Sequence, residues 1–499
     1  MSPGVLAAVQ FSWLAVLPLG IVALAAVAVL LAGARAGQDQ GEALGWFSAA
    51  ALAAAALPVL ASLGRSRLAF DGTVAVDAYS VYFELVILFA SAMTVLISLR
   101  YVAEMGLAPG EYYALVLFAA LGMMLMAAAD DLILIFLGLE TMSLAVYALA
   151  GFARRQARSA EAALKYFLLG AFSTGFLLYG IALIYGAAGT LKLEPLRAAL
   201  AAGTDHRTLL LCGVGLVLIG FAFKVAAVPF HMWTPDAYEG APTPIAGFMA
   251  VGVKLASFAA FLRVFGLHLG ALAPTWTAVV WVVAALTMTA GNLIALAQQS
   301  LKRMLAYSAI AHAGYLLVGM AAGSNEAAGA ILYYLLGYAF TNLGAFAVVV
   351  ALERRGVEHE SIADLRGLGA RAPGLSAALA LLLLSLTGMP PLAGFVGKLY
   401  LFKAALDSGL VWLVVIAVLN SVVSAYYYLR VLVAVYMQEG GVAVAPLAAR
   451  PALLVAVGAA VLGTVLIGVF PAPYVAAAGA ALRSALSLSS PGPLALIAR

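Results

Sequence analysis

Charged residues are scarce in this chain. Of its 499 residues only 10% are Asp, Glu, Lys or Arg, while 65% are hydrophobic and the mean hydropathy is +1.09. An ordinary soluble domain is about 25% charged and about 45–50% apolar. The composition therefore excludes a soluble domain and predicts an all-α protein that crosses a membrane many times.

Cysteine is almost absent as well. Cys212 is the only one, which excludes an intrachain disulfide, a thiolate iron–sulfur cluster and a Cys-rich zinc site. The histidines at 206, 231, 268, 312 and 359 form no obvious haem pair. We therefore expect no cofactor and no metal on this chain. The net charge of +4 fits positive cytoplasmic loops better than nucleic-acid binding.

Apolar runs of about 20 residues, the length that spans a bilayer, recur along the whole chain. Fourteen are predicted, and they lie near 12–33, 44–63, 79–99, 112–129, 131–151, 162–187, 209–230, 245–266, 275–297, 304–321, 328–351, 374–405, 410–436 and 451–470. Only Asp130 and Asp131 separate the fourth from the fifth, so we expect a tight turn there. The loops after odd-numbered spans carry more Lys and Arg, which predicts that both termini lie outside.

Two of these spans are interrupted. The seventh contains Pro229, and the twelfth contains LTGMPPLAGFVGKL over 386–399. Non-helical backbone at membrane depth is tolerated only where it faces protein or a wet cavity, and paired breaks mark transport sites. A Pro kink that only shapes helix packing is the alternative.

The breaks lie five spans apart, which predicts two five-helix units of inverted topology, because an odd number of helices reverses direction when repeated. The expected division is an N-terminal three-helix segment over 1–110, a first unit over 111–268, a second over 269–437, and a C-terminal helix and tail over 438–499.

Three charges stand near the middle of apolar spans, namely Glu140, Lys224 and Lys254. A charge at this depth costs at least about 2.5–3.5 kcal/mol and usually marks an ion or proton pathway. A buried ion pair that only fixes helix packing is the alternative, but the third charge has no place in a simple pair. Burial favours the neutral form of each group, whereas pairing of Glu140 with Lys224 would favour the charged forms. Separating the two groups would therefore move a proton.

Further candidates lie beside these charges. Lys398 follows the second break, while Lys403 is interpreted as a residue that reaches the membrane surface. His312 occupies the position that corresponds to Glu140 in the second unit, and His231 adjoins the first break. These two histidines and Lys165 are candidate relay residues, with an ordinary packing role as the alternative for each.

Five stretches of the chain resemble one known family: GFAFKVAAVPFHMWTPDAYEGAPTP, EAALKYFLLGAFSTGFLLYG, LKRMLAYSAIAHAGYLL, PLAGFVGKLYLF and LNSVVSAYYYLRV. Over about 70–440 they are similar to subunit N of the proton-pumping NADH:quinone oxidoreductase, respiratory complex I. The resemblance implies fourteen helices with two inverted five-helix units. It also implies a proton path through Glu140 in GLETMSL, Lys224 in GFAFK, Lys254 in GVKLASF and Lys398 in GFVGKLY.

The expected function is therefore that of a membrane-arm subunit that translocates protons while partner subunits oxidise NADH and reduce quinone. NADH, FMN, iron–sulfur clusters and quinone are expected in those partners, and the bacterial inner (plasma) membrane is the expected location. The alternatives are a cation/proton antiporter subunit of the Mrp type and a non-conducting scaffold subunit. The lysine-rich centre disfavours the antiporter, because hard cations prefer oxygen ligands.

Overall fold

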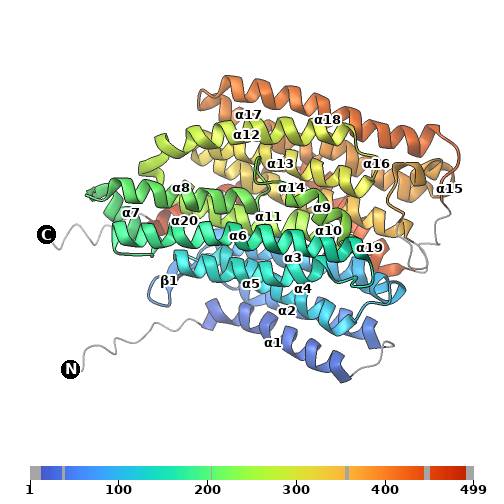
Figure 1. Ribbon diagram of the computed structural model, residues 1–499, viewed down its shortest axis with the longest axis horizontal. Helices are drawn as coiled ribbons and strands as arrows, with labels where there is room; N and C mark the ends of the chain where they lie inside the picture. Colours follow the sequence, from blue (N-terminus) through green and yellow to red (C-terminus); the bar gives the residue numbers. More distant parts are fainter. Residues whose placement is uncertain (1–12, 36–39, 204, 354–358, 443–449, 490–499) are drawn as a thin grey trace.

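The helices of the chain lie side by side in one elongated bundle, and most loops gather at its two ends (Figure 1). The structure is a computed structural model that describes residues 13–35, 40–203, 205–353, 359–442 and 450–489. The ends of the predicted first and last segments, 1–12 and 490–499, lie outside the described residues.

The first eight crossings follow the predicted spans closely. They are α1 (Trp13–Arg35), α2 (Gly41–Leu60), α3 (Ala78–Glu104), α4 (Pro109–Ala128), α5 (Leu132–Ala150), α6 (Ala157–Ala188), the pair α8 (Arg207–Lys224) and α9 (Trp233–Gly240), and a helix built from α10 (Thr243–Phe248), η2 (Met249–Val253), α11 (Lys254–Phe261) and η3 (Leu262–His268).

The remaining crossings are α12 (Ala273–Leu296), α13 (Leu301–Ala322), α14 (Asn325–Leu352), the pair α16 (Pro373–Thr387) and α17 (Ala393–Asp407), α18 (Val411–Met437) and α19 (Pro451–Val469). Thirteen helices of the described residues are long and apolar enough to span a membrane, and the α16–α17 pair supplies one more crossing. The prediction of an all-α membrane fold with about fourteen spans is confirmed.

One end of the bundle holds both the start of α1 and the end of α20 (Pro471–Ser489), and we call it the terminal side (Figure 1). A small hairpin of β1 (Arg67–Ala69) and β2 (Val74–Val76) lies there, with Arg67 opposite Val76 in antiparallel register. Isolated bridges extend this ladder to Ala129 and Lys192, and the short helix α7 (Leu193–Ala202) follows. The turn predicted at Asp130 and Asp131 is therefore held against a small cap on this side.

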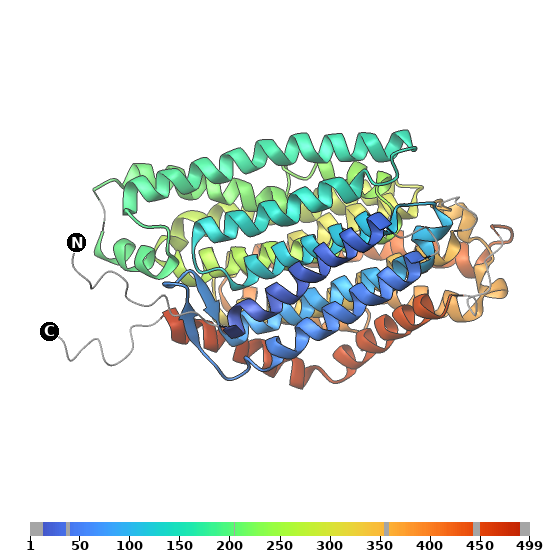
Figure 2. The same ribbon diagram turned by 90° about the horizontal axis from the view of Figure 1, so that it is seen from below.

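The helix α20 was not predicted. Its sequence is rich in alanine, which favours helix formation but contributes little hydrophobicity, and Pro471 suits a first helical position. Arg450, before α19, binds Glu104 at the end of α3, whereas Ser484 of α20 binds Ala78 at the start of α3. The two helices therefore follow one another end to end along α3, at the edge of the bundle opposite α6 (Figure 2).

The break in the seventh crossing begins earlier than the sequence predicted. Proline has no N–H and its ring clashes with the carbonyl group four residues before it. For Pro229 that carbonyl belongs to Val225, and α8 ends at the preceding residue, Lys224. The chain crosses the break over 225–232 and continues as α9.

The break in the twelfth crossing lies where it was predicted. Helix α16 ends at Thr387, and Gly388 adopts a left-handed φ of +95°. Pro390 and Pro391 then keep the chain out of the helical conformation until α17 begins at Ala393. Helix α8 enters from the terminal side and α16 from the other side, as inverted units require. The division into units remains a prediction.

Candidate functional site

Lys224 is the last residue of α8, and its ammonium group lies in a pocket of hydroxyl groups. Its Nζ donates to Ser143 Oγ at 2.7 Å and to Tyr147 Oη at 3.0 Å, both on α5. The side chain is buried, with 2% of its surface exposed. Within the described residues no carboxylate lies in ion-pair contact with it. Its charge is therefore solvated by hydroxyl groups and by the carbonyl end of α8.

The predicted ion pair between Glu140 and Lys224 is wrong for this structure. Glu140 Oε1 accepts a hydrogen bond from Thr174 Oγ1 of α6 at 2.8 Å. The residues that hold Lys224 come three and seven positions later on α5, which at 1.5 Å per residue is roughly 4.5–10.5 Å further along the helix. The end of α8 therefore meets α5 beyond Glu140.

The surroundings of Glu140 also differ from the prediction. Its side chain is only half-buried, on a face of α5 that exposes Leu137 and Leu144. Because the side chain of Glu140 reaches the lateral surface of the bundle, its carboxylate can contact the lipid or protein that covers this surface.

Lys254 lies at the point where the eighth crossing changes its helical form. The segments before and after α11, η2 and η3, are both π-helical. Such segments are rare and often occur at functional sites. Lys254 is 1% exposed, and its Nζ donates to the carbonyl oxygen of Ala309 on α13 and faces the ring of Tyr338 at 5.5 Å.

His312 connects the surroundings of Lys254 with those of Lys398. Its ring lies 5.3 Å from the ring of Tyr338, which faces Lys254, and 5.7 Å from that of Tyr315. Lys398 Nζ lies 4.8 Å from the centre of that second ring. His312, which was predicted to correspond to Glu140 in the second unit, therefore packs against the two tyrosine rings that face Lys254 and Lys398.

Both ring nitrogens of His312 have a hydroxyl partner. Nδ1 is hydrogen-bonded to Tyr334 Oη, and Nε2 lies 3.2 Å from Tyr428 Oη, which is itself bound to Ser308. A neutral imidazole donates at one nitrogen and accepts at the other, and a hydroxyl group can do either. The arrangement can therefore pass a proton from one side of the ring to the other.

Lys398 reaches back across the second break. Its Nζ donates to the carbonyl oxygens of Thr387 and Leu386 at 2.8 and 3.1 Å, and to Ser421 Oγ at 2.9 Å. The side chain is 4% exposed and, among the described residues, lies in no ion pair. The ammonium group is thus stabilised by the negative end of α16.

The other two candidates are less buried than the three lysines. His231 is half-buried within the first break. Lys165 pairs with Glu161 at 2.6 Å and with Asp236 of α9 at 2.8 Å. Arg303 binds the same Asp236 at 2.8 Å. Lys165 therefore belongs to a partly exposed ionic network on the side opposite the termini.

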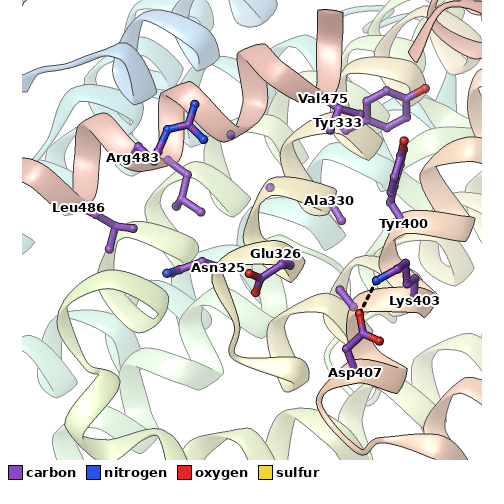
Figure 3. A pocket seen from close by; sticks show the side chains of 14 residues that line it. Asn325, Glu326, Ala330, Tyr333, Tyr400, Lys403, Asp407, Val475, Arg483 and Leu486 are labelled. Atoms are coloured by element: carbon purple, nitrogen blue, oxygen red, sulfur yellow. Dashed lines mark hydrogen bonds and ion pairs between the residues drawn. The ribbon is translucent and has the colours of Figure 1, made fainter. Parts of the chain in front are cut away.

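A hollow of about 460 Å³ lies on the terminal side, between α14, α17 and α20 (Figure 3). Lys403 lines it and pairs with Asp407 at 2.6 Å, with most of both side chains exposed. This agrees with the interpretation of Lys403 as a residue that reaches the surface. None of the four principal site residues lines this hollow.

A group of buried charged residues on the terminal side was not predicted from the sequence as part of a site. It consists of Glu84 on α3, Asp77 at the start of the same helix, Arg263 and His268 of η3, and Asp130. The signal was present, because FLRVF and FELVILF each place one charge in an apolar run. Within the described residues no cluster of three or more His, Cys, Asp or Glu side chains could hold a metal ion. That this chain carries no cofactor remains a prediction.

Comparison with known proteins gives consistent matches. The family model described as "NADH:quinone oxidoreductase/Mrp antiporter, TM" matches residues 129–424. The NADH-quinone oxidoreductase subunit N of Trichlorobacter lovleyi is 47% identical over 85% of this chain and 88% of its own length.

Two solved structures have the same fold. A chain of respiratory complex I from Thermus thermophilus is 39% identical, with a TM-score of 0.78 over 93% of this chain and 100% of that chain. A chain of the Mrp complex from Dietzia sp. is 22% identical, with a TM-score of 0.80 over 95% of this chain and 99% of that chain. The second likeness concerns the fold alone.

Proposed function

The chain belongs to the subunit N family of NADH-quinone oxidoreductases, and we propose that its buried lysines carry protons across the membrane. It is an antiporter-like membrane subunit of a proton-pumping complex, and its partners are the other subunits of that complex. The proposed path consists of Glu140, Lys224, Lys254 and Lys398, with His312 as the relay between the last two and with Lys165 and His231 as further candidates.

The contacts of His312 carry this proposal. Lys254 and Lys398 are each held by carbonyl or hydroxyl oxygens and face a tyrosine ring, and His312 packs against both rings. An amine without a carboxylate partner can lose its proton at a lower cost than an ion-paired one, because no opposite charge is left behind. Two such amines on either side of an imidazole that is bound by hydroxyl groups can act in one proton-transfer chain.

The energy for transport must come from outside the chain. Moving one charge against 100 mV costs about 2.3 kcal/mol. NADH oxidation and quinone reduction in partner subunits supply it, and NADH, FMN, iron–sulfur clusters and quinone bind there. The chain itself acts as the translocase part of the enzyme.

Two alternatives make different predictions. An Mrp-type cation/proton antiporter needs oxygen ligands for a hard cation, whereas the described centre offers three lysines. A non-conducting scaffold needs no titratable centre. The proposed location is the bacterial inner membrane, with the terminal side outside, because the opposite side carries the larger number of Lys and Arg residues.

Substitution of His312 tests the relay. We expect His312→Ala to assemble and to lower coupled proton transport by about 10²-fold or more, the usual effect of removing a proton-transfer group. Native proton transport in an assembled complex with this variant would contradict the relay.

A further inference from the structure

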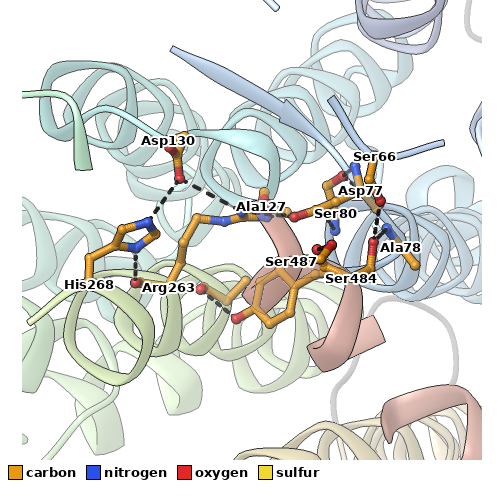
Figure 4. Close-up of polar contacts among 12 residues, drawn as sticks. Ser66, Asp77, Ala78, Ser80, Ala127, Asp130, Arg263, His268, Ser484 and Ser487 are labelled. Atoms are coloured by element: carbon orange, nitrogen blue, oxygen red, sulfur yellow. Dashed lines mark hydrogen bonds and ion pairs between the residues drawn. The ribbon is translucent and has the colours of Figure 1, made fainter. Parts of the chain in front are cut away.

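Asp77, Asp130, Arg263 and His268 form one buried network on the terminal side (Figure 4). Arg263 donates to both carboxylate oxygens of Asp77, at 3.1 and 3.2 Å, and lies 3.8 Å from Asp130. His268 Nε2 lies 3.7 Å from the same Asp130 oxygen. No more than 5% of any of these four side chains is exposed.

The charges of this network do not balance when His268 is neutral. Two carboxylates then face one guanidinium group, which leaves one negative charge in a buried site. The neighbouring charges do not correct this, because Glu194 is paired with Arg197, Lys192 with Asp71, and Asp131 caps the start of α5. An uncompensated buried charge is costly, so the network favours the uptake of one proton.

The hydrogen bonds of His268 indicate where that proton binds. Its Nδ1 lies 2.8 Å from the carbonyl oxygen of Arg263, so Nδ1 must carry a hydrogen and donate it. Nε2 is then free of hydrogen in the neutral ring and faces Asp130. Burial raises the pKa of Asp130 to about 7, although Arg263 opposes this shift. One proton can therefore be bound by this pair of groups, either on Asp130 Oδ1 or on His268 Nε2, which lie 3.7 Å apart.

Glu84 lies on α3, further from the terminal side than Asp77 and at about the level of Lys254 along the eighth crossing. Tyr79 of α3 donates to the carbonyl oxygen of Ala259 at 2.8 Å, and Asp77 binds Arg263. Because α3 and the eighth crossing run in opposite directions, these pairs place Glu84 opposite 254–256. Its side chain tilts toward the start of α3, where Asp77 and Arg263 interact with it electrostatically.

The carboxyl group of Glu84 takes part in none of the hydrogen bonds and ion pairs described above. The residue is 8% exposed, and within the described part of the chain its carboxyl group accepts no hydrogen bond and lies in no ion pair. Arg263 Nε and Ser257 Oγ, near the same interface, are likewise buried without a partner among the described residues. A buried carboxyl group in a membrane span is a candidate functional site.

We propose that Glu84, Asp130 and His268 form a proton-carrying branch that connects Lys254 with the terminal side of the membrane. The branch rests on the proposed function of Lys254. A proton leaves the ammonium group of Lys254, which becomes a neutral amine, and binds the carboxylate of Glu84. It then passes to the Asp130–His268 pair and leaves at the terminal surface. Arg263 is a positioning residue that holds both aspartates.

The test compares Glu84→Gln, Asp130→Asn and Glu84→Asp in the whole complex in its native membranes. Glu104→Gln is the matched control, since Glu104 lies on the same helix but pairs with Arg450 at the other end. We expect Glu84→Gln and Asp130→Asn to lower the proton yield per NADH, normalised to assembled complex, at least about tenfold. Glu84→Asp should retain most of the yield, and the control should retain all of it.

Infrared difference spectra between resting and turning-over complex give a second readout. A protonated-carboxyl band should appear in the native complex and be lost in Glu84→Gln, which a merely structural role would not produce. If Glu84→Gln pumps at the native yield while Lys254→Ala does not, the branch is wrong and the proposed function stands. If Lys254→Ala also pumps at the native yield, the proposed function itself fails.

Discussion

The ammonium group of Lys398 donates to the carbonyl oxygen of Thr387, the last residue of α16, at 2.8 Å. One half of the broken twelfth crossing is thus capped by a lysine from the other half. Gly388 follows the cap, and a Cβ added there would lie 3.2 Å from Lys398 Cδ. The break and the charge are therefore parts of one feature, since the half-helix end stabilises the ammonium form.

Removal of the Lys398 charge should affect both transport and the end of α16. We expect Lys398→Met to abolish most coupled proton transport and to destabilise the α16 end by about 0.3–2 kcal/mol, the usual energy of a cation at a helix C-terminus. Proton uptake and hydrogen exchange at 384–388 measure the two effects. Lys398→Arg keeps the charge and should preserve the cap. Equal exchange in all three proteins would contradict the capping role.

The partners of Lys224 should matter more to this lysine than Glu140 does. Ser143→Ala combined with Tyr147→Phe removes both hydroxyl groups that bind Nζ, and each buried group left unsatisfied costs about 1–3 kcal/mol. We therefore expect the double variant to destabilise the buried ammonium group and to slow coupled turnover strongly.

Glu140→Gln is the contrasting variant, because Glu140 binds Thr174 instead. It should leave the contacts of the Lys224 ammonium group nearly unchanged even if it slows transport. The nitrogen chemical shift of labelled Lys224 measures this. A shift as large in Glu140→Gln as in the double variant would restore the ion-pair interpretation.

Close packing at the second break predicts an unequal response of two glycines. A Cβ at Gly394 would overlap the carbonyl oxygen of Ser385, whereas a Cβ at Gly374 on the same crossing would meet no atom within 4 Å. We expect Gly394→Ala to lower stability by about 1–3 kcal/mol. Gly374→Ala should raise it by about 0.5–1 kcal/mol, because alanine favours the helix. Thermal unfolding of the detergent-solubilised complex compares them, and equal melting temperatures would be evidence against the packing described here.

The proposed orientation can be tested by labelling. In a Cys212→Ser background, cysteines at Arg155 and Arg366 should react with an impermeant thiol reagent only from the cytoplasmic side. A cysteine at Arg65, which is exposed on the terminal side, should react only from outside. The reverse pattern would place the terminal side in the cytoplasm, and the branch of Glu84, Asp130 and His268 would then open to the cytoplasm.

Much of the fold could be predicted from the sequence because membrane spans obey a simple length rule. The fourteen crossings and both breaks follow from apolar run length and from the positions of Pro229, Pro390 and Pro391. Helix α20 did not follow, because an alanine-rich helix is only weakly hydrophobic. Its place along α3 is fixed by packing and by Ser484, which no local pattern indicates.

The candidate site could be predicted only as separate residues. A lysine in an apolar run is visible in the sequence, but its partners come from segments far away along the chain. Ser143 lies 81 residues before Lys224 in the sequence, and Tyr147 lies 77 residues before it. The predicted pairing of Lys224 with Glu140 is wrong because the depth at which α8 ends decides which residues of α5 Lys224 contacts. Arg263 and Glu84 were missed although each stands alone in an apolar run.

Proton transport by the buried lysines is tested most directly by the proton yield of complexes that carry Lys224→Ala, Lys254→Ala or Lys398→Ala. Complex assembly, NADH oxidation by the peripheral arm and proton uptake should be measured in the same membranes. If the buried lysines carry protons, each variant assembles and keeps native peripheral NADH oxidation with an artificial acceptor, but loses most of its coupled proton uptake. Native proton uptake in all three assembled variants would contradict this role and would favour a scaffold.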